Sequence, residues 1–257
     1  MSGLSASNLV FSYGRRAVLR ESSFGPIEAG GLTALIGPNA AGKSTLFRVI
    51  AGLLRPSAGQ VMLGEIDLAS LSSRQRLRCV CFMPQFFSAN AALTVFDAVM
   101  MAHKQLRGWR VSDADMIAVG EALATAGIGH LSEAYVGELS GGQSQMVSVA
   151  QALIRRSDVY LFDEPTSALD LRHQLDVLAR IRAAMRMRGV IGIVALHDLN
   201  LAARFADRMM LMGDGRILAE GTPWNVLRSE AIGTLYGVDT EVSLGPREEL
   251  VVHAYAP

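Results

Sequence analysis

The sequence predicts an α/β protein with a mostly parallel sheet flanked by helices. Segments with strand character alternate with segments of helical periodicity along most of the 257 residues. Such alternation favours parallel strands joined by helical crossovers. Between Thr94 and about Arg156 the periodicity is helical, with no strong strand signal. The sequence therefore also predicts a helical insertion within the α/β core.

The N-terminal half combines several strand signals with one clear helix. Short apolar stretches bounded by glycine, proline and polar turns are typical of strands. The helix is expected to begin at Lys43 and to end near Pro56, because proline cannot continue a helix. The strands are expected at residues 9–11, 32–36, 60–64 and 79–83.

The C-terminal half begins with apolar strands and ends in a weakly patterned tail. The dipeptide Asp214-Gly215 separates two apolar runs and predicts a hairpin, because Asp-Gly supplies the positive φ angles of a tight turn. A short helix is expected after Pro223. The other expected elements are strands at 159–162 and 190–194, a helix at 173–188, and hairpin strands at 208–212 and 216–219.

The charge balance argues against a nucleic-acid binder. Lysine and arginine together number 24, as do aspartate and glutamate, so the formal net charge is zero. Domains that neutralise phosphates carry a clustered positive excess instead. Only 19% of residues are charged, against roughly 25% in typical soluble domains, and 50% are hydrophobic. No window of about 20 residues is apolar enough to span a bilayer, and the N-terminus lacks a secretory signal pattern, so we expect a cytoplasmic location.

The two cysteines, Cys79 and Cys81, give no sign of a metal or redox site. A C-x-C pair lacks the second pair of ligands that a zinc site needs, and its spacing is not that of a C-x-x-C redox motif. Alternate residues of a strand point to the same face. We therefore expect two buried thiols in a reducing compartment.

The strongest motif is a glycine-rich turn of the form G-x-x-x-x-G-K-[ST] between a predicted strand and a predicted helix. Glycines allow backbone N–H groups to converge on phosphate oxygens, and the helix N-terminus adds a favourable field. The lysine of this motif can reach the β- and γ-phosphates, and the serine offers a hydroxyl to Mg²⁺. The motif predicts a nucleoside triphosphate site made by Gly37, Pro38, Asn39, Ala40, Ala41, Gly42, Lys43, Ser44 and Thr45.

Two further segments suggest what such a site does. The apolar strand at 159–162 ends in Asp163 and Glu164, of which the first can hold Mg²⁺ and the second can deprotonate an attacking water. Ser140 and Gln143 form the pattern of a capping box at the start of a predicted helix. A cap does not require two glycines in the first helical turn, whereas close approach of backbone amides to a phosphate does.

In this order, the glycine-rich turn, LSGGQ and FDEP resemble the ATP-binding subunit of an ABC transporter. The resemblance covers nearly the whole chain and implies one ABC ATP-binding domain over residues 1–257. It implies a P-loop NTPase cassette with a RecA-like core sheet, an N-terminal antiparallel β portion and an inserted α-helical subdomain. Residues 1–86 and 158–257 would form the catalytic α/β core, and residues 87–157 the helical subdomain with the signature motif.

The resemblance also implies a mechanism that uses ATP and Mg²⁺. Glu164 would be the general base, with Lys43 and His197 on the γ-phosphate, and Tyr13 would stack on adenine. Mg²⁺ would be held by Ser44, Asp163 and Gln85, with Gln85 also near the attacking water. Two copies of the chain would face head to tail as a homodimer. Each ATP would then also be held in trans by Ser140, Gly141, Gly142, Gln143 and Asp170 of the opposite copy.

The sequence after LSGGQ narrows the family branch. The runs SGGQSQMVSVAQAL, TSALDLRHQLDVL and LYGVDTEV resemble the branch that powers import of iron(III)–siderophore complexes and, by extension, haem and cobalamin. The resemblance implies an integral-membrane permease and an extracytoplasmic substrate-binding protein as partners, and a peripheral position at the cytoplasmic face of the membrane. The transported compound stays open, since this subunit never touches it. Remote alternatives are a non-transport ABC ATPase and a regulatory nucleotide-binding module.

Three local features carry smaller expectations. Ala40 stands where many members of the family have glycine, and we expect it to be tolerated with slightly less backbone freedom. The Met-rich stretch within residues 86–101 is expected to form part of the permease dock, because methionine suits adaptable apolar contacts. Arg74, Arg76 and Arg78 are expected to form a solvated helix face.

Overall fold

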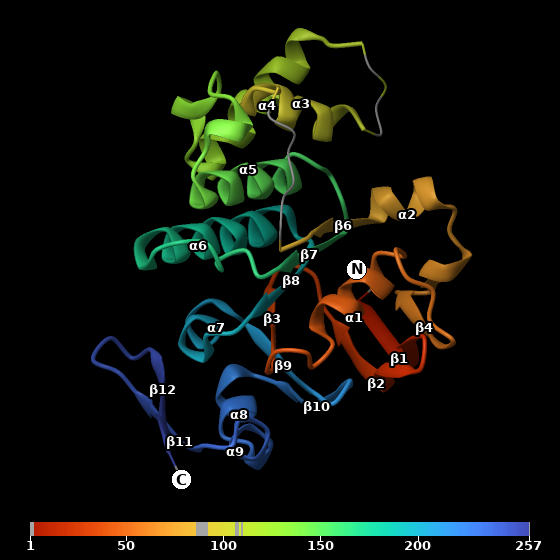
Figure 1. Ribbon diagram of the computed structural model, residues 1–257, viewed down its shortest axis with the longest axis vertical. Coiled ribbons are helices and arrows are strands. Elements are labelled where there is room, and N and C mark those ends of the chain that lie inside the picture. The colour runs from red at the N-terminus through yellow and green to blue at the C-terminus, as the bar shows by residue number, and fades with distance from the viewer. Residues whose placement is uncertain (1–2, 86–91, 106–107, 109, 257) are drawn as a thin grey trace.

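The computed structural model describes residues 3–85, 92–105, 108 and 110–256, and it confirms the predicted fold class (Figure 1). In these residues the central sheet has six strands in the order β10-β9-β3-β8-β7-β6. All neighbours in this sheet run parallel except β9 and β10, which form the antiparallel hairpin. The strands are β3 (Leu32–Ile36), β6 (Val80–Met83), β7 (Val159–Asp163), β8 (Ile191–Leu196), β9 (Arg208–Gly213) and β10 (Arg216–Gly221).

Both faces of the central sheet are covered. Successive residues of β7 point to opposite faces, so Tyr160 and Phe162 join one core while Val159 and Leu161 join another. Helices α5 (Gly141–Leu153), α6 (Leu171–Arg188) and α7 (Leu199–Phe205) cover the first face (Figure 1). The second core lies between the sheet, helix α1 (Lys43–Ile50) and an antiparallel sheet from the N-terminal part of the chain.

The antiparallel sheet has the order β2-β1-β4-β5 within the described residues. Its strand β1 pairs with both β2 and β4. The sequence predicted parts of β1 and β4 but not β2, whose residues are mostly polar or exposed. The strands are β1 (Leu4–Tyr13), β2 (Arg16–Ile27), β4 (Ala58–Leu63) and β5 (Ile66–Asp67).

The helical part lies at one end of the molecule, above the sheet in Figure 1. It consists of α3 (Val95–Lys104), α4 (Asp113–Ala126) and α5, and α4 contacts both of the others. Each of these three helices begins with a capping box, in which the N-cap side chain and the N3 side chain bond each other's backbone N–H. Three short 3₁₀ turns also occur at Leu68–Ser70, Gly129–Leu131 and Val136–Glu138.

The C-terminal tail is more ordered than its pattern indicated. After α8 (Pro223–Leu227) and α9 (Glu230–Tyr236), strands β11 (Asp239–Leu244) and β12 (Leu250–Tyr255) form a separate hairpin. The side chain of Asn200 on α7 bonds the backbone of Val252 in both directions. This exchange holds the hairpin against the core.

Several boundaries differ from the sequence prediction. Helix α1 ends at Ile50 and not near Pro56, because Gly52 takes a left-handed conformation with φ of 74°. Cys79 is the last residue of a short helix, α2 (Ser73–Cys79), and is only partly buried, whereas Cys81 is buried in β6. The two thiols therefore do not share a strand face, contrary to our expectation.

Two predictions fall partly outside the described residues. The predicted boundary between the catalytic core and the helical subdomain, between residues 86 and 87, lies outside the described residues. Residues 86–91 of the predicted permease dock also lie outside them. None of the helices in the described ranges is both long and apolar enough to cross a lipid bilayer.

Candidate functional site

The chemically interesting residues follow the carboxyl ends of four neighbouring parallel strands. The glycine-rich turn follows β3, Gln85 follows β6, Asp163 ends β7 and His197 follows β8. In open α/β sheets, ligands bind in the crevice at this edge. The fold therefore brings together segments that are far apart in the sequence.

The turn before α1 needs its glycines for backbone geometry. Gly37 has a φ of 151°, and a Cβ there would lie 2.2 Å from the carbonyl oxygen of Met212. Gly42, the N-cap of α1, has a φ of 108°. Ala40 lies between them with a φ of 64°, a left-handed conformation that strains an alanine. The sequence predicted only slightly less backbone freedom at Ala40, whereas the structure places this residue in a strained conformation.

Lys43 is folded back onto this turn. Its Nζ donates hydrogen bonds to the carbonyl oxygens of Gly37 at 2.7 Å and Pro38 at 3.1 Å, and the residue is 5% exposed. Burial lowers the pKa of the ammonium group, while the nearby carboxylates of Glu164 and Asp163 oppose this shift. A buried cation of this kind is poised to receive an anion.

A cavity of about 410 Å³ opens over the turn and the start of α1. Residues 39–45 form its floor, and Tyr13, Arg16 and Glu164 form its walls. Tyr13 is 45% exposed and packs edge-on against Phe11, with ring centroids 4.8 Å apart. The structure therefore brings the partly exposed Tyr13 ring next to the glycine-rich turn.

Asp163 and Ser44 meet at the end of β7. The Ser44 hydroxyl donates to Oδ1 of Asp163 at 3.1 Å, and Asp163 is 2% exposed. Burial raises the pKa of the Asp163 carboxyl, partly offset by the Ser44 hydrogen bond. A carboxylate and a hydroxyl are the oxygen ligands that Mg²⁺ prefers, so this donor set fits the ion. No cluster of three or more His, Cys, Asp or Glu side chains that could hold a metal by themselves occurs among the described residues.

Glu164 is held by two partners from other strands. Nε2 of Gln85 donates to one carboxylate oxygen, and Nε2 of His197 is paired with the other. Glu164 has a φ of 52°, a strained conformation for a residue with a side chain. Backbone strain of this kind is concentrated at functional sites, and here it directs the carboxylate into a cavity shared with Ser44.

Two residues of this region were missed by sequence reasoning. Tyr236 of α9 lines the cavity with Gln85, Glu164 and His197, and its buried hydroxyl has only a weak contact with the Gly37 backbone N–H in the described part of the chain. Gln145 of α5 is 4% exposed and donates to the carbonyl oxygen of Glu164 at 3.4 Å. Tyr236 lies in the LYGV segment, which was noticed only as a family resemblance, and Gln145 is the second residue after the signature motif.

The signature residues lie in a different cavity. Ser140, Gly141, Gly142, Gln143 and Asp170 share that cavity with neighbouring residues, apart from Lys43 and Glu164. Ser140 and Gln143 form the capping box of α5, at 2.9 and 3.3 Å. A Cβ on Gly142 would lie 3.2 Å from a methyl group of Leu169, whereas Gly141 has room for one. A Cβ at 142 would thus require a small shift of the Leu169 side chain, whereas the contacts of the described residues do not require a glycine at 141.

This geometry defines a class of protein. The phosphate site of P-loop nucleoside triphosphatases has a glycine-rich turn between a strand and a helix N-terminus. It also has a buried lysine on that turn and a strand-end carboxylate beside the serine of the motif, and both are present here.

Comparison with known proteins identifies the family. The sequence model of the family described as ABC transporter matches residues 20–167, which is more than half of the chain. The chain therefore belongs to the ABC transporter family and is an ATPase.

Relatives of known name cover almost the whole chain. The hemin import ATP-binding protein of Bordetella pertussis is 37% identical over 95% of this chain and 95% of its own length. The iron(3+)-hydroxamate import ATP-binding protein of Bacillus subtilis is 33% identical over 96% of this chain and 92% of its own length.

Solved structures agree with this assignment. A metal-chelate type ABC transporter in an inward-facing conformation is similar with a TM-score of 0.82 and 27% identity, covering 99% of this chain and 97% of that one. A dimeric ATP-binding cassette bound to ADP and phosphate is similar with a TM-score of 0.77 and 26% identity, covering 86% and 98%.

Proposed function

We propose that this chain is the ATP-hydrolysing subunit of an importer for an iron(III)–siderophore complex, acting as a homodimer on an integral-membrane permease. The observation that carries the ATPase part is the convergence of Lys43, Asp163 and Glu164 at one edge of the sheet. The transport part is supported by relatives named for import of hemin, petrobactin and iron(3+)-hydroxamate. A substrate-binding protein outside the membrane completes the proposed assembly, with this subunit peripheral on the cytoplasmic side.

The core side of the site would bind the nucleotide. Tyr13 stacks on adenine, and backbone N–H groups of residues 39–45 surround the phosphates. Lys43 leaves the carbonyl oxygens of Gly37 and Pro38 for the β- and γ-phosphates, because a phosphate is a stronger partner for a buried ammonium group than a neutral carbonyl. Mg²⁺, held by Ser44, Asp163 and Gln85, supplies charge neutralisation at the phosphate oxygens when bound.

Glu164 would act as the general base of hydrolysis. Its carboxylate accepts a proton from water as the water oxygen bonds to the γ-phosphorus, and the bond from that phosphorus to ADP breaks. Gln85 and His197 already bond the carboxylate and so orient it. In the reaction His197 donates to a γ-phosphate oxygen, and Gln85 positions the water.

The second half of each site would come from another copy of the chain. The Ser140–Gln143 segment and Asp170 share a cavity separate from that of Lys43. A head-to-tail dimer places this segment of one copy against the phosphates bound by the other, in keeping with the dimeric cassette of similar fold. Ser140, Gly141, Gly142 and Gln143 then contact the γ-phosphate in trans, which gives the open side of Gly141 a role.

Haem is the second candidate substrate. The hemin import relatives are 36–39% identical, slightly more than the petrobactin and hydroxamate relatives at 33–34%. Reconstitution with the cognate permease in lipid nanodiscs separates the candidates. We expect ATP hydrolysis to be stimulated by the binding protein loaded with an iron(III)–siderophore, and not by one loaded with haem. Stimulation by a sugar- or amino-acid-binding protein alone would contradict iron-chelate import, and the Glu164→Gln variant is the matched control for hydrolysis.

A further inference from the structure

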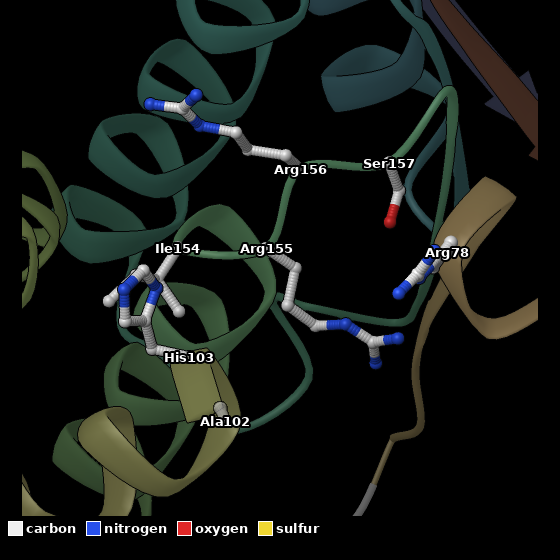
Figure 2. Close-up of a pocket in the computed structure, with 7 residues that line it drawn as sticks. All are labelled: Arg78, Ala102, His103, Ile154, Arg155, Arg156 and Ser157. Atoms are coloured by element: carbon white, nitrogen blue, oxygen red, sulfur yellow. The ribbon is translucent and has the colours of Figure 1, made fainter. Parts of the chain in front are cut away.

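A cavity of about 320 Å³ lies away from the nucleotide site, at the opposite edge of the central sheet (Figure 2). It is bordered by the C-terminal ends of α2, α3 and α5 and by the turn that enters β7. Strands β6 and β7 begin beside this cavity and run toward Gln85 and Asp163, so the length of β7, about 16 Å, separates the two sites. The cavity therefore belongs to neither half of the ATP site.

The lining of this cavity is basic. Arg78, Arg155 and Arg156 all border it, and no carboxylate is among the described residues that do. None of these three arginines makes an ion pair within the described ranges, although Arg155 donates to the carbonyl oxygen of Leu77 at 2.7 Å. Figure 2 shows the guanidinium groups of Arg78 and Arg155 turned toward each other. Two like charges facing across a cavity favour an anion between them.

The charged groups behind the lining do not neutralise it. Arg188 lies over the Tyr160 ring at 5.9 Å and adds a further positive charge. Asp158 is exposed and lies against the thiol of Cys79. His103 borders the cavity from α3, and its Nε2 bonds Asp115 at 2.9 Å. Asp115 in turn is held by Lys104 and Ser112, so its charge is already compensated.

Ser157 supplies an independent sign of a ligand. The residue is 6% exposed, and its backbone N–H donates to the Tyr160 hydroxyl at 3.1 Å. Its Oγ is buried and has no hydrogen-bond partner among the residues that the structure describes. Buried hydroxyl groups are nearly always paired, so one that lies at the edge of a basic cavity calls for an acceptor.

We propose that this cavity binds a phosphate group, held by Arg78, Arg155 and the Ser157 hydroxyl. Arginine forms paired hydrogen bonds with phosphate oxygens, and a rotating hydroxyl completes such a site as a neutral donor. The volume admits a phosphate or diphosphate, free or as a lipid headgroup. The group bridges α2 and β6 of the core to the end of α5, and thereby fixes the helical part against the sheet. Arg78 thus has a role beyond the solvated helix face that its sequence context predicted.

Calorimetric titration of pyrophosphate into the chain saturated with ADP tests this site, because ADP keeps the P-loop filled. We expect one binding site in the wild type, weakened about tenfold in Arg78→Gln, which corresponds to about 1.4 kcal/mol. Ser157→Ala should weaken it less. Arg74→Gln, an exposed arginine of the same helix outside the cavity, is the matched control and should bind as the wild type does.

Sedimentation with phosphatidylglycerol vesicles, compared with phosphatidylcholine vesicles, distinguishes the source of the phosphate. Binding of vesicles but not pyrophosphate, lost in Arg78→Gln, assigns the site to a lipid headgroup. The proposal is overturned if neither probe binds or if Arg78→Gln and Arg74→Gln behave alike. ATP hydrolysis by Arg78→Gln without pyrophosphate should equal that of the wild type. A negative result in the phosphate-binding experiments would therefore leave the proposed ATPase function intact.

Discussion

The two halves of the proposed ATP site differ in how their polar groups are satisfied. In the core half, Lys43 and Asp163 are buried charges, and Glu164 and Ala40 have strained left-handed backbones. In the helical half, Ser140 and Gln143 are satisfied by their own capping box. The core half therefore gains stability from a charged ligand, whereas the helical half is complete without one. This difference is what a site divided between two copies of the chain requires.

The largest effect is expected for Glu164→Gln, which removes the base but keeps the shape. Steady-state phosphate release should fall by about 10²–10⁴-fold, the usual contribution of general base catalysis. ATP binding and ATP-dependent dimerisation should persist, since the core half still binds the phosphates. Glu138→Gln, an exposed glutamate just before the signature motif, is the control. Wild-type turnover in Glu164→Gln would remove Glu164 from its proposed role.

The chain has two lysines, Lys43 at the phosphate site of the core and Lys104 in helix α3 of the helical part, and they allow a direct comparison. Lys43→Met should weaken ATP binding by about 100-fold, the equivalent of about 2.8 kcal/mol, with little change in the urea midpoint without nucleotide. A buried ion replaced by an apolar side chain is often neutral for stability.

Lys104→Met should give the opposite result. It leaves Asp115 without its ammonium partner, so the urea midpoint should fall while ATP affinity stays unchanged. ATP affinity is measured by nucleotide titration. Equal losses of ATP affinity in Lys43→Met and Lys104→Met would contradict the different roles assigned to the core and to the helical part.

Acid should weaken the helical part through Asp115. Hydrogen bonds from Lys104 and Ser112 hold the pKa of this carboxyl well below its usual value, so it contributes stability above the unfolded pKa of about 3.9. That contribution is lost as the pH falls below about 4. The stability difference between the wild type and Asp115→Asn, measured by urea unfolding, should be constant from pH 7 to 5 and shrink below 4. A difference that is constant at all pH values would exclude Asp115 from this role.

Tyr236→Phe should lower the rate of ATP turnover with little change in the stability of the protein. The buried Tyr236 hydroxyl has only a weak contact with the Gly37 backbone N–H, so its removal should change the free energy of unfolding by no more than about 1 kcal/mol. If the hydroxyl bonds the γ-phosphate or the water, kcat should fall about twofold to tenfold at the same time. Unchanged kcat and KM would make Tyr236 a packing residue only.

The smallest effect is expected for Ala40→Gly. A left-handed alanine is strained by about 1–2 kcal/mol, and the greater unfolded-state freedom of glycine offsets part of the gain. The free energy of unfolding should rise by about 0.5–1 kcal/mol in thermal or urea unfolding. Gly141→Ala in the helical half should leave it nearly unchanged, because a Cβ there meets only ordinary contacts. A loss of stability in Ala40→Gly would show that the strain is not relieved.

Sequence reasoning identified candidate site residues where the expected chemistry lies within one contiguous segment. Residues 37–45 and the pair Asp163 and Glu164 each combine a strand with its terminal polar residues, so local pattern alone located them. Gln85 and His197 are single polar residues at strand ends, and only their order relative to those motifs distinguished them. The parallel fold class followed from alternating strand and helix signals, whereas β2 and α2 were missed because their residues are largely exposed.

The remaining features depend on packing between distant segments. Tyr236 reaches the cavity from α9, and no local pattern indicates that its hydroxyl ends beside Glu164. Arg78 and Ser157 meet only because β6 and β7 are neighbours in the sheet. The strain at Glu164 likewise arises from the turn after β7 and not from its sequence.

Cysteine cross-linking between two differently tagged chains tests the divided site most directly. One chain carries Asn39→Cys beside the phosphates, the other carries Ser140→Cys, and both carry Glu164→Gln with serine in place of Cys79. Both positions are exposed in the single chain. A head-to-tail dimer predicts a cross-linked species of twice the chain mass that forms with ATP and not without it. No ATP-dependent cross-link, or an equal yield when Arg74→Cys replaces Ser140→Cys, would contradict the account.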